Sequence, residues 1–342
     1  MRVVRLTPID GELPNIALMK LAHFHKAQGD DVYLERSLEP TLFELSPDIV
    51  YGSAIFNFSA DRVARFKTAF PTAFVSGTGI ARNGGVTVEE MIGEESYENY
   101  DYSIYPDFNA SIGFTQRGCR LKCGFCVVPV KEGKPRSLNT IERLWRGDPY
   151  PRQLHILDND FFGQPEWRER IAEIKDGAFK VCLSQGINVR LIHEEGAKAL
   201  ATIDYRNKDF TAKRLYTAWD NLKDEKVFFR GMDMLEANGV PPKHVMAYML
   251  IGFDPAETWT RIWHRFTRMV ERKINPYPMV FNRSRSDLLC FQRWVIAGGG
   301  QYRFIQWGDY QRETKTQESV EAWKPYAERL AIATAKPMKE AA

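Results

Sequence analysis

Three cysteines, Cys119, Cys123 and Cys126, lie within eight positions of the sequence. Thiolates at these spacings can hold three corners of an iron–sulfur cubane and leave one iron open, whereas a closed structural zinc site needs four ligands. The other two cysteines, Cys182 and Cys290, are far away in the sequence, so a fourth ligand is possible but not required. The spacing therefore favours an iron–sulfur cluster over zinc, although cysteine spacing can suit either metal.

A regular series of secondary-structure elements must position this loop. From residue 111 onward, helical segments separate six apolar, strand-like runs, at residues 112–115, 154–157, 181–184, 215–218, 245–251 and 278–281. Strands that repeat in one direction with helical crossovers form a parallel sheet, and six such steps predict a parallel barrel or part of one. The cysteines would then follow the first strand of this partial barrel.

Polar or small residues follow the next four predicted strands. In parallel barrels the chemistry lies at the carboxyl ends of the strands. The residues at these ends are, in strand order, Asp158, Asn159, Asp160, Asn188, Arg190, Asp220 and Gly252. We therefore expect the functional site there, although a simple turn would explain the acidic triplet equally well and a salt bridge at the rim would explain the arginine.

Residues 1–107 carry an alternation of their own. Strands are expected at residues 2–6, 31–34, 48–51 and 73–76, and helices at 14–28 and 60–70. This βαβ pattern predicts a small parallel-sheet domain. No Gly-x-Gly-x-x-Gly follows the first strand, so we predict no dinucleotide site. Between residues 94 and 107, four tyrosines among acidic residues predict an ordered linker that packs its rings.

The cysteine loop resembles the defining signature of the radical S-adenosylmethionine (radical SAM) superfamily, in which an aromatic residue, here Phe125, precedes the last cysteine. The flanking sequences are similar to the loop of its methylthiotransferase and cobalamin-binding branches, through Arg117, Gly118, Val127, Val128, Pro129, Gly133 and Arg136. The resemblance covers residues 111–282. It implies an α/β protein with a Rossmann-like, degenerate cobalamin-binding-like (B12-binding-like) domain at 1–107, a partial (β/α)6 TIM-type barrel at 108–285 and a C-terminal aromatic and helical cap at 286–342.

The resemblance also implies what binds after the first two strands of the barrel. The three cysteines would ligate a 4Fe–4S cluster whose open iron chelates the amino and carboxylate groups of SAM. The family's Gly-Gly-Glu element would follow the second strand, but Asp158, Asn159 and Asp160 stand there instead. A carboxylate or amide of this triplet would bind the methionyl ammonium, and the sequence leaves open which residue does so.

The remaining SAM contacts are implied at the next three strands. Ser184, Asn188 and Arg190 match the third-strand segment that contacts the carboxylate and ribose of SAM, and an arginine suits a carboxylate through its bidentate fork. Asp220 takes the place of a family glutamate that binds the ribose hydroxyls. Gly252 lies in the stretch that backs the adenine, where the lack of a side chain permits close approach.

The implied reaction is the one-electron reductive cleavage of SAM to methionine and a 5′-deoxyadenosyl radical, which abstracts hydrogen from an unidentified substrate. It needs a reductant such as flavodoxin or ferredoxin. No cysteine precedes Cys119, so the second cluster of the methylthiotransferases is not expected. Residues 8–14 lack the histidine that often ligates cobalamin, so cobalamin is not favoured. A cobalamin-dependent methyltransferase and a non-catalytic iron–sulfur or zinc protein remain the alternatives.

A stripe of arginines recurs farther along the chain, at Arg261, Arg265, Arg268 and Arg272. Spacings of four, three and four residues predict one face of a helix. A solvated helix face is the simpler interpretation, and contact with nucleic acid or a phosphate-bearing substrate is the alternative. The aromatic residues between 291 and 310 are expected to cap the open side of the barrel.

Composition narrows the class of protein. The chain has 342 residues, of which 44% are hydrophobic and 27% are charged, which is typical of globular proteins. Its formal net charge of +3 gives no general attraction to nucleic acid or anionic lipid. The amino terminus lacks a secretory hydrophobic stretch, and no apolar run approaches the roughly 18 residues of a membrane span. We therefore expect a soluble, cytoplasmic protein with no membrane partner.

Overall fold

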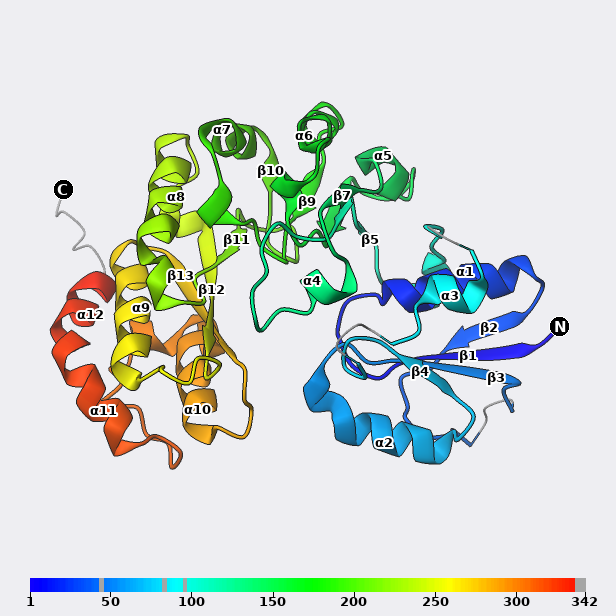
Figure 1. The fold of residues 1–342 in the computed structure, drawn as a ribbon, viewed down its shortest axis with the longest axis horizontal. Helices are drawn as coiled ribbons and strands as arrows, with labels where there is room; N and C mark the ends of the chain where they lie inside the picture. Colours follow the sequence, from blue (N-terminus) through cyan, green and yellow to red (C-terminus); the bar gives the residue numbers. More distant parts are fainter. Residues whose placement is uncertain (43–45, 82–84, 95–96, 336–342) are drawn as a thin grey trace. The chain divides into compact units, whose positions relative to one another are not determined.

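The computed structural model describes residues 1–42, 46–81, 85–94 and 97–335, and the chain divides into two compact units (Figure 1). The first unit comprises Met1–Gly113, Gly118–Lys134 and Arg146–Pro151. The second comprises Phe114–Arg117, Pro135–Trp145 and Arg152–Ala342. The chain thus passes between the units several times, and the cysteine loop belongs to the first.

The first unit contains a four-stranded parallel sheet in the order β2-β1-β3-β4. Its elements are β1 (Val3–Pro8), α1 (Ile16–Ala27), β2 (Asp31–Leu34), β3 (Ile49–Ser53), α2 (Ala60–Ala69), β4 (Phe74–Ser76), α3 (Val88–Ile92), β5 (Ser111–Gly113) and α4 (Val128–Lys131). The six elements predicted for residues 1–76 agree with these bounds to within two residues. The prediction of a parallel sheet with helices between its strands in this part of the chain is confirmed.

Local chemistry explains how the helices of this sheet begin and where they pack. Asn15 caps α1, and its side chain accepts a hydrogen bond from the N–H of Leu18 at 3.2 Å. Helices α1 and α2 lie on opposite faces of the sheet (Figure 1). Phe66 of α2 is fully buried in a cluster with Ile9 and Val50, which forms part of the core of the unit.

The described residues of the tyrosine-rich segment are ordered, as predicted, because their rings and hydroxyls pack against α1 and its surroundings. The Tyr97 hydroxyl lies 2.6 Å from Nδ1 of His23. The Tyr105 hydroxyl accepts from the N–H of Asn15 at 3.1 Å. Lys20, which is almost fully buried on α1, pairs with Glu98 of the segment at 2.6 Å.

The second unit contains parallel strands in two sheets. One includes β8 (Gln153–Ile156), β9 (Lys180–Cys182) and β10 (Asp204–Tyr205), and the other consists of β11 (Leu215–Ala218), β12 (Val245–Ile251) and β13 (Asn275–Val280). The segment after β9 runs beside β11, because the N–H of Ile187 donates to the Tyr216 carbonyl at 2.8 Å. Strands β11 and β12 have the predicted bounds, whereas the short β10 was not predicted.

The first predicted barrel strand, residues 112–115, is shorter than expected. Strand β5 ends at Gly113, and a separate strand, β6 (Gln116–Arg117), pairs antiparallel with β7 (Arg136–Ser137). The chain departs from the strand where Thr115 and Gln116 turn their N–H groups to a buried carboxylate, described below. The expectation of one strand through residue 115 is therefore wrong.

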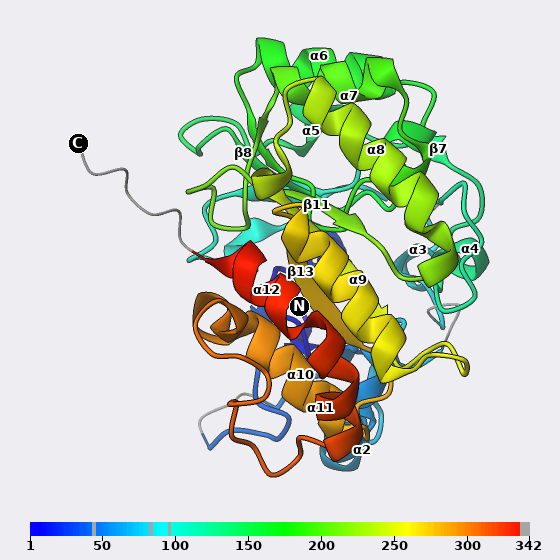
Figure 2. The same ribbon diagram turned by 90° about the vertical axis from the view of Figure 1, so that its left-hand side faces the viewer.

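Helices follow the strands of the second unit and continue into its C-terminal part (Figure 2). They are α5 (Ile141–Leu144), α6 (Trp167–Asp176), α7 (Glu194–Thr202), α8 (Glu225–Ala237), α9 (Trp259–Glu271), α10 (Ser286–Ile296), α11 (Gln317–Trp323) and α12 (Ala327–Thr334). Along β12, buried and partly exposed residues alternate, which is typical of a strand with one covered and one open face. No helix in the described part of the chain is long and apolar enough to cross a membrane.

Most of the aromatic residues expected to form a cap are buried together around α9 and α10, whereas Phe304 is 72% exposed. Four tryptophans, Trp259, Trp263, Trp294 and Trp307, form the centre of this cluster, with ring centroids of neighbouring pairs 5.3–6.4 Å apart. Two of their indole N–H groups donate to Ser319 of α11, at 3.0 and 3.2 Å. Helices α11 and α12 therefore lie beside α9 (Figure 2).

Candidate functional site

The three cysteines lie on a loop, residues 118–134, whose base is closed by hydrogen bonds. The N–H of Gly118 donates to the Glu132 carboxylate at 2.9 Å, and the N–H of Cys119 donates to the Gly133 carbonyl at 3.2 Å. Gly118 has a φ of +85°, and a Cβ placed there would lie 2.2 Å from the Lys134 carbonyl oxygen. Only glycine fits this position without moving the backbone.

Within the loop, the cysteines are thiols outside any disulfide, and all three are half-buried, as is Phe125. The N–H of Leu121 lies 3.4 Å from Sγ of Cys119, within reach of a backbone-to-sulfur hydrogen bond. The N–H of Cys126 donates to the carbonyl of Cys123 at 3.0 Å, which turns the chain between these two cysteines. The loop thus carries three partly accessible sulfurs on a short, hydrogen-bonded stretch of backbone.

The donor chemistry of this loop fits an iron–sulfur cluster. Cysteine sulfurs are the usual ligands of such clusters, and an N–H donor to sulfur, as at Cys119, is among the contacts that tune them. Across residues 1–42, 46–81, 85–94 and 97–335, no three His, Cys, Asp or Glu side chains lie close enough together to hold a metal ion. The fit therefore rests on the identity and spacing of the donors.

The carboxylate of Asp158, at the end of β8, is bound within the chain. Its Oδ1 accepts from the N–H groups of Thr115 at 2.8 Å and Gln116 at 3.0 Å, and its Oδ2 contacts the Thr115 hydroxyl. Burial raises the pKa of Asp158 to about 7 in spite of these hydrogen bonds. These contacts give Asp158 a structural task, and a ligand contact at Asp158, at Asn159 or at the buried Asp160 stays a prediction.

The predicted residues after β9 lie on a turn that contacts two neighbouring segments. The carbonyl of Ser184 accepts from the Tyr248 hydroxyl of β12 at 2.7 Å. Asn188 is half-buried and precedes the short helical turn Val189–Leu191. The Arg190 guanidinium pairs with Asp224 at 2.7 Å, and both side chains are about one-fifth exposed. This is the rim salt bridge that the sequence left as the alternative to a SAM contact.

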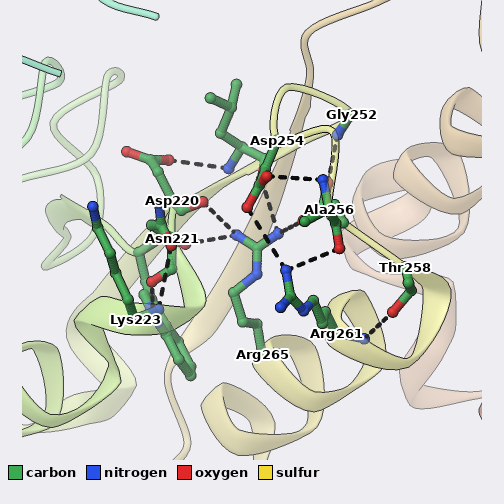
Figure 3. A network of polar contacts seen from close by, with 12 residues as sticks. Asp220, Asn221, Lys223, Gly252, Asp254, Ala256, Thr258, Arg261 and Arg265 are labelled. Atoms are coloured by element: carbon green, nitrogen blue, oxygen red, sulfur yellow. Dashed lines mark hydrogen bonds and ion pairs between the residues drawn. The ribbon is translucent and has the colours of Figure 1, made fainter. Parts of the chain in front are cut away.

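Asp220 follows β11 and lies in a network of polar contacts centred on Arg265 of α9 (Figure 3). Its Oδ1 accepts from the N–H of Leu250 at 3.0 Å. Burial raises the pKa of Asp220, whereas the N–H of Leu250 and the charges of Arg265 and Arg190 oppose that shift. The charges of Arg190 and Asp224 also act on the pKa of Asp220, so their salt bridge lies near this carboxylate. The structure thus brings together the charged residues that follow β9 and β11.

Gly252 ends β12 in the same network. Its φ is +79°, and a Cβ there would lie 2.7 Å from Cδ1 of Leu288. Its N–H donates to Glu257 at 2.6 Å, and Glu257 also contacts Arg265. Gly252 thus lies close to a side chain of α10, and the approach of an adenine to this glycine stays a prediction.

Tyrosines from β11, β12 and β13 lie next to one another, at Tyr216, Tyr248 and Tyr277. The ring centroids of Tyr216 and Tyr248 are 5.9 Å apart and nearly parallel, and those of Tyr248 and Tyr277 are 5.7 Å apart and perpendicular. Burial raises the pKa of Tyr216 to about 12 and also raises that of Tyr248. Both phenols therefore remain protonated hydrogen-bond donors at neutral pH.

The arginine stripe does not form one solvated face of α9, because Arg265 is buried at 1% exposure. The expectation of four guanidiniums on one exposed face is therefore wrong. The other three arginines are paired with acids: Arg261 with Asp254 at 3.8 Å, Arg268 with Glu225 at 3.1 Å, and Arg272 with Asp233 at 2.6 Å. These pairs offset the positive charge that the stripe suggested.

Sequence reasoning missed three residues of this site: Glu257, Arg265 and Asp224. Arg265 carried one usable signal, because it lies within the apolar arc of a helix whose buried residues include Ile262 and Phe266. A charged residue in such an arc is buried only when it is paired. Nothing in the local sequence distinguishes Glu257 or Asp224 from the acids that lie exposed on the surface.

The first unit offers a second place where parallel α/β sheets bind ligands, at the carboxyl ends of β1 and β3, where the strand order reverses. Here the carboxylate of Asp10 accepts from the N–H groups of Ile55 at 2.7 Å and Phe56 at 3.0 Å. A Cβ on Gly77 would lie 2.2 Å from the Ala54 carbonyl oxygen. The described loops at this edge therefore pack directly against one another.

No protein-family model matches this chain, and comparison with curated proteins and with solved structures finds no significant match either.

Proposed function

We propose that this protein is a radical SAM enzyme. The observation that carries the proposal is the loop of residues 118–134, which holds three cysteine thiols at the spacing of that superfamily and has a hydrogen-bonded base. Three cysteine ligands would leave one iron of a 4Fe–4S cluster without a protein ligand, and SAM would bind there. The sequence of parallel strands β8, β9, β11, β12 and β13 supports a partial (β/α)6 barrel as the frame.

In this proposal Cys119, Cys123 and Cys126 hold a 4Fe–4S cluster. When bound and reduced, the cluster supplies the electron that cleaves SAM into methionine and a 5′-deoxyadenosyl radical, which abstracts hydrogen from the substrate. The protein holds the sulfurs in place through the loop base, and the N–H of Leu121 stabilises negative charge on Cys119. A low-potential one-electron donor, such as a flavodoxin or a ferredoxin, is the proposed partner, and the substrate is unidentified.

The residues that follow the strands of the second unit would bind SAM. Among the described residues, no hydrogen-bond donor reaches Oδ2 of Asp220, so this oxygen can accept from a ribose hydroxyl. Arg190, which pairs with Asp224 at 2.7 Å, is the proposed partner of the SAM carboxylate. Asn159 and Asp160 are the candidates for the methionyl ammonium, with Ser184, Asn188 and Gly252 beside the nucleoside.

The test is anaerobic reconstitution with iron and sulfide, followed by assays of bound iron and of 5′-deoxyadenosine formed from SAM with dithionite. We expect the wild-type protein to retain the cluster and cleave SAM. Cys123→Ala should lose most of the iron and all cleavage, whereas the control Cys290→Ala, which changes a buried cysteine outside the loop, should keep both. Unchanged iron content and cleavage in Cys123→Ala would refute the proposal, and bound zinc without cleavage would favour a non-catalytic metalloprotein.

A cobalamin-dependent methyltransferase is the second candidate, and the parallel β2-β1-β3-β4 sheet of the first unit favours it. Two observations argue against the usual binding of cobalamin through a histidine ligand. The loop after β1 contains no histidine, and the two histidines of α1 are engaged elsewhere: His23 with Tyr97 at 2.6 Å and His25 with Asp30 at 2.8 Å. A near-stoichiometric corrinoid absorbance after expression with cobalamin would make methyl transfer the leading reaction.

A further inference from the structure

One buried side chain, Arg265 of α9, joins the ends of two neighbouring strands. One of its terminal nitrogens donates to the carbonyl oxygens of Trp219 at 3.0 Å and Asp220 at 3.1 Å, which follow β11. The other donates to the carbonyl oxygen of Leu250 in β12 at 2.9 Å. Figure 3 shows the guanidinium between Asp220 on one side and the loop from Gly252 to Ala256 on the other.

The charge of Arg265 is balanced by Glu257, which is also buried. The second nitrogen of Arg265 contacts Oε1 of Glu257, whose Oε2 accepts from the N–H of Gly252 at 2.6 Å. Burial lowers the pKa of Arg265 and raises that of Glu257, so both charges are held at a desolvation cost. Apolar packing commonly stabilises a protein as well as a buried ion pair does. The pair is therefore better explained by the geometry that it specifies.

That geometry includes the side chain of Asp220. Arg265 binds the carbonyl of Asp220 itself and the carbonyl of Leu250, and the N–H of Leu250 donates to Oδ1 of Asp220 at 3.0 Å. The backbone on both sides of the carboxylate is thus fixed by one guanidinium. Within the described part of the chain, no donor contacts Oδ2 of Asp220, so the fixed carboxylate presents one open oxygen.

We propose that Arg265 is a positioning residue of the SAM site, which holds Asp220 so that its open oxygen accepts hydrogen bonds from the ribose hydroxyls. This inference rests on the proposed function. It assigns no contact with SAM to Arg265, because all four acceptors of its terminal nitrogens belong to the protein. Lysine cannot replace it, since an ammonium on a flexible stem lacks the planar fork that reaches several acceptors at once.

The first test compares Arg265→Lys with Arg268→Lys in the reconstituted protein, by calorimetric titration with SAM. Arg268 lies three residues further along α9, is 38% exposed and pairs with Glu225, so it is a matched control away from the strand ends. We expect Arg265→Lys to weaken SAM binding about tenfold or more, and Arg268→Lys to change it less than about twofold. Equal affinities in the two variants would overturn the inference.

The second test asks whether Arg265 acts through Asp220. Positioning predicts that the effects are not additive, because Arg265→Lys has nothing left to disturb once the carboxylate is gone. The double variant Arg265→Lys/Asp220→Asn should therefore bind SAM within about twofold of Asp220→Asn alone. Losses that add in full would assign Arg265 a general structural role and refute the inference.

A third measurement needs neither cluster nor SAM. Hydrogen exchange of the apo protein should be faster at the N–H groups of Leu250 and Gly252 in Arg265→Lys and unchanged in Arg268→Lys. If wild-type protein does not bind SAM, the proposed function fails whatever the exchange shows. If it does bind, and Arg265→Lys alters neither affinity nor exchange, only this inference fails. Should Arg265→Lys not fold, Glu257→Gln replaces it, with the same expected direction of each change.

Discussion

At the scale of single residues, the ionisable groups of this protein have environments that differ sharply. Asp158 is fully enclosed, and three hydrogen-bond donors surround a carboxyl whose pKa is nevertheless raised to about 7. Desolvation therefore outweighs hydrogen bonding at this site. The protonated form is favoured by folding, which gives the residue a measurable effect on how stability depends on pH.

Asp158→Asn tests this effect. The pKa of Asp158 is higher in the folded protein than its unfolded value of 3.8, so the protonated carboxyl stabilises the fold. This stabilisation is fully present below about pH 4 and is lost as the pH rises through 7. We expect the free energy of unfolding of the wild type to fall by on the order of 3 kcal/mol more than that of Asp158→Asn between pH 4 and pH 8. Urea unfolding at both pH values measures the difference.

The exposed Asp176, at the end of α6, provides the control, since Asp176→Asn removes a carboxyl from the surface instead of the interior. An asparagine at 158 can still accept from both backbone N–H groups. The same slope in wild type and Asp158→Asn would show that the carboxyl is ionised in the folded protein at neutral pH.

At the scale of elements, the cysteine loop depends on a glycine pair at its base. Gly118 and Gly133 both have positive φ, of +85° and +73°. A Cβ at Gly118 would lie 2.2 Å from a backbone oxygen, whereas a Cβ at Gly133 would meet nothing within 4 Å. The two positions therefore separate the cost of a left-handed backbone from the cost of a clash.

Gly118→Ala should open the base of the loop and lose most of the bound iron after reconstitution. Gly133→Ala should cost only about 1–2 kcal/mol of backbone strain and keep the iron. Limited proteolysis of the apo proteins provides a readout that does not depend on the cluster, and Gly118→Ala should be cleaved faster in the loop. If the two variants behave alike, the close approach of Gly118 to the Lys134 carbonyl is not required for the loop conformation.

The strands were largely predictable from the sequence because their signal is local. Apolar runs bounded by turn residues define β11 and β12 to the residue, and in the first unit amphipathic spacing defines α1 and α2 closely. The short β10 escaped prediction, since two residues carry no periodicity. The division of the strands between two sheets also depends on hydrogen bonds between distant segments.

The chemistry of the site was less predictable, because its decisive contacts are long-range. Arg265 bonds to carbonyl groups 15 to 46 residues away, and Asp158 to N–H groups 42 and 43 residues away. Almost every residue has a backbone carbonyl and a backbone N–H group. The residue types therefore do not show which of these groups will bond to a distant side chain. Sequence spacing could therefore propose which polar residues matter, but not which of them the fold itself would use.

At the scale of the whole molecule, each of the two units has a core and a set of charge contacts of its own. In the first unit, Asp30 accepts from Arg2 at 2.6 Å and lies 2.8 Å from Nδ1 of His25. The hydrogen bonds from Arg2 and His25 hold the pKa of Asp30 well below its usual range. These partners link the first strand, the first helix and the turn before β2.

Asp30→Asn should therefore loosen the first unit selectively. At neutral pH, we expect faster hydrogen exchange in β1, β2 and α1, and unchanged exchange in β11, β12 and β13, because Asp30 bonds to Arg2 and His25, which both belong to the first unit. The pKa of Asp30 is lower in the folded than in the unfolded protein, so its ionised carboxyl stabilises the fold only above the unfolded pKa. As the pH falls below about 4, the difference in exchange between wild type and Asp30→Asn should therefore shrink. Equal increases in both units would contradict this expectation.

The tryptophan cluster around α9 has a practical consequence for every such experiment. All eight tryptophans of the chain, from Trp145 to Trp323, belong to the second unit, and the first has none. Emission excited at wavelengths that only indole absorbs is therefore a built-in optical reporter of one half of the molecule. Circular dichroism of the backbone samples both halves, so a discrepancy between the two signals during denaturation would identify which unit melts first without any added label.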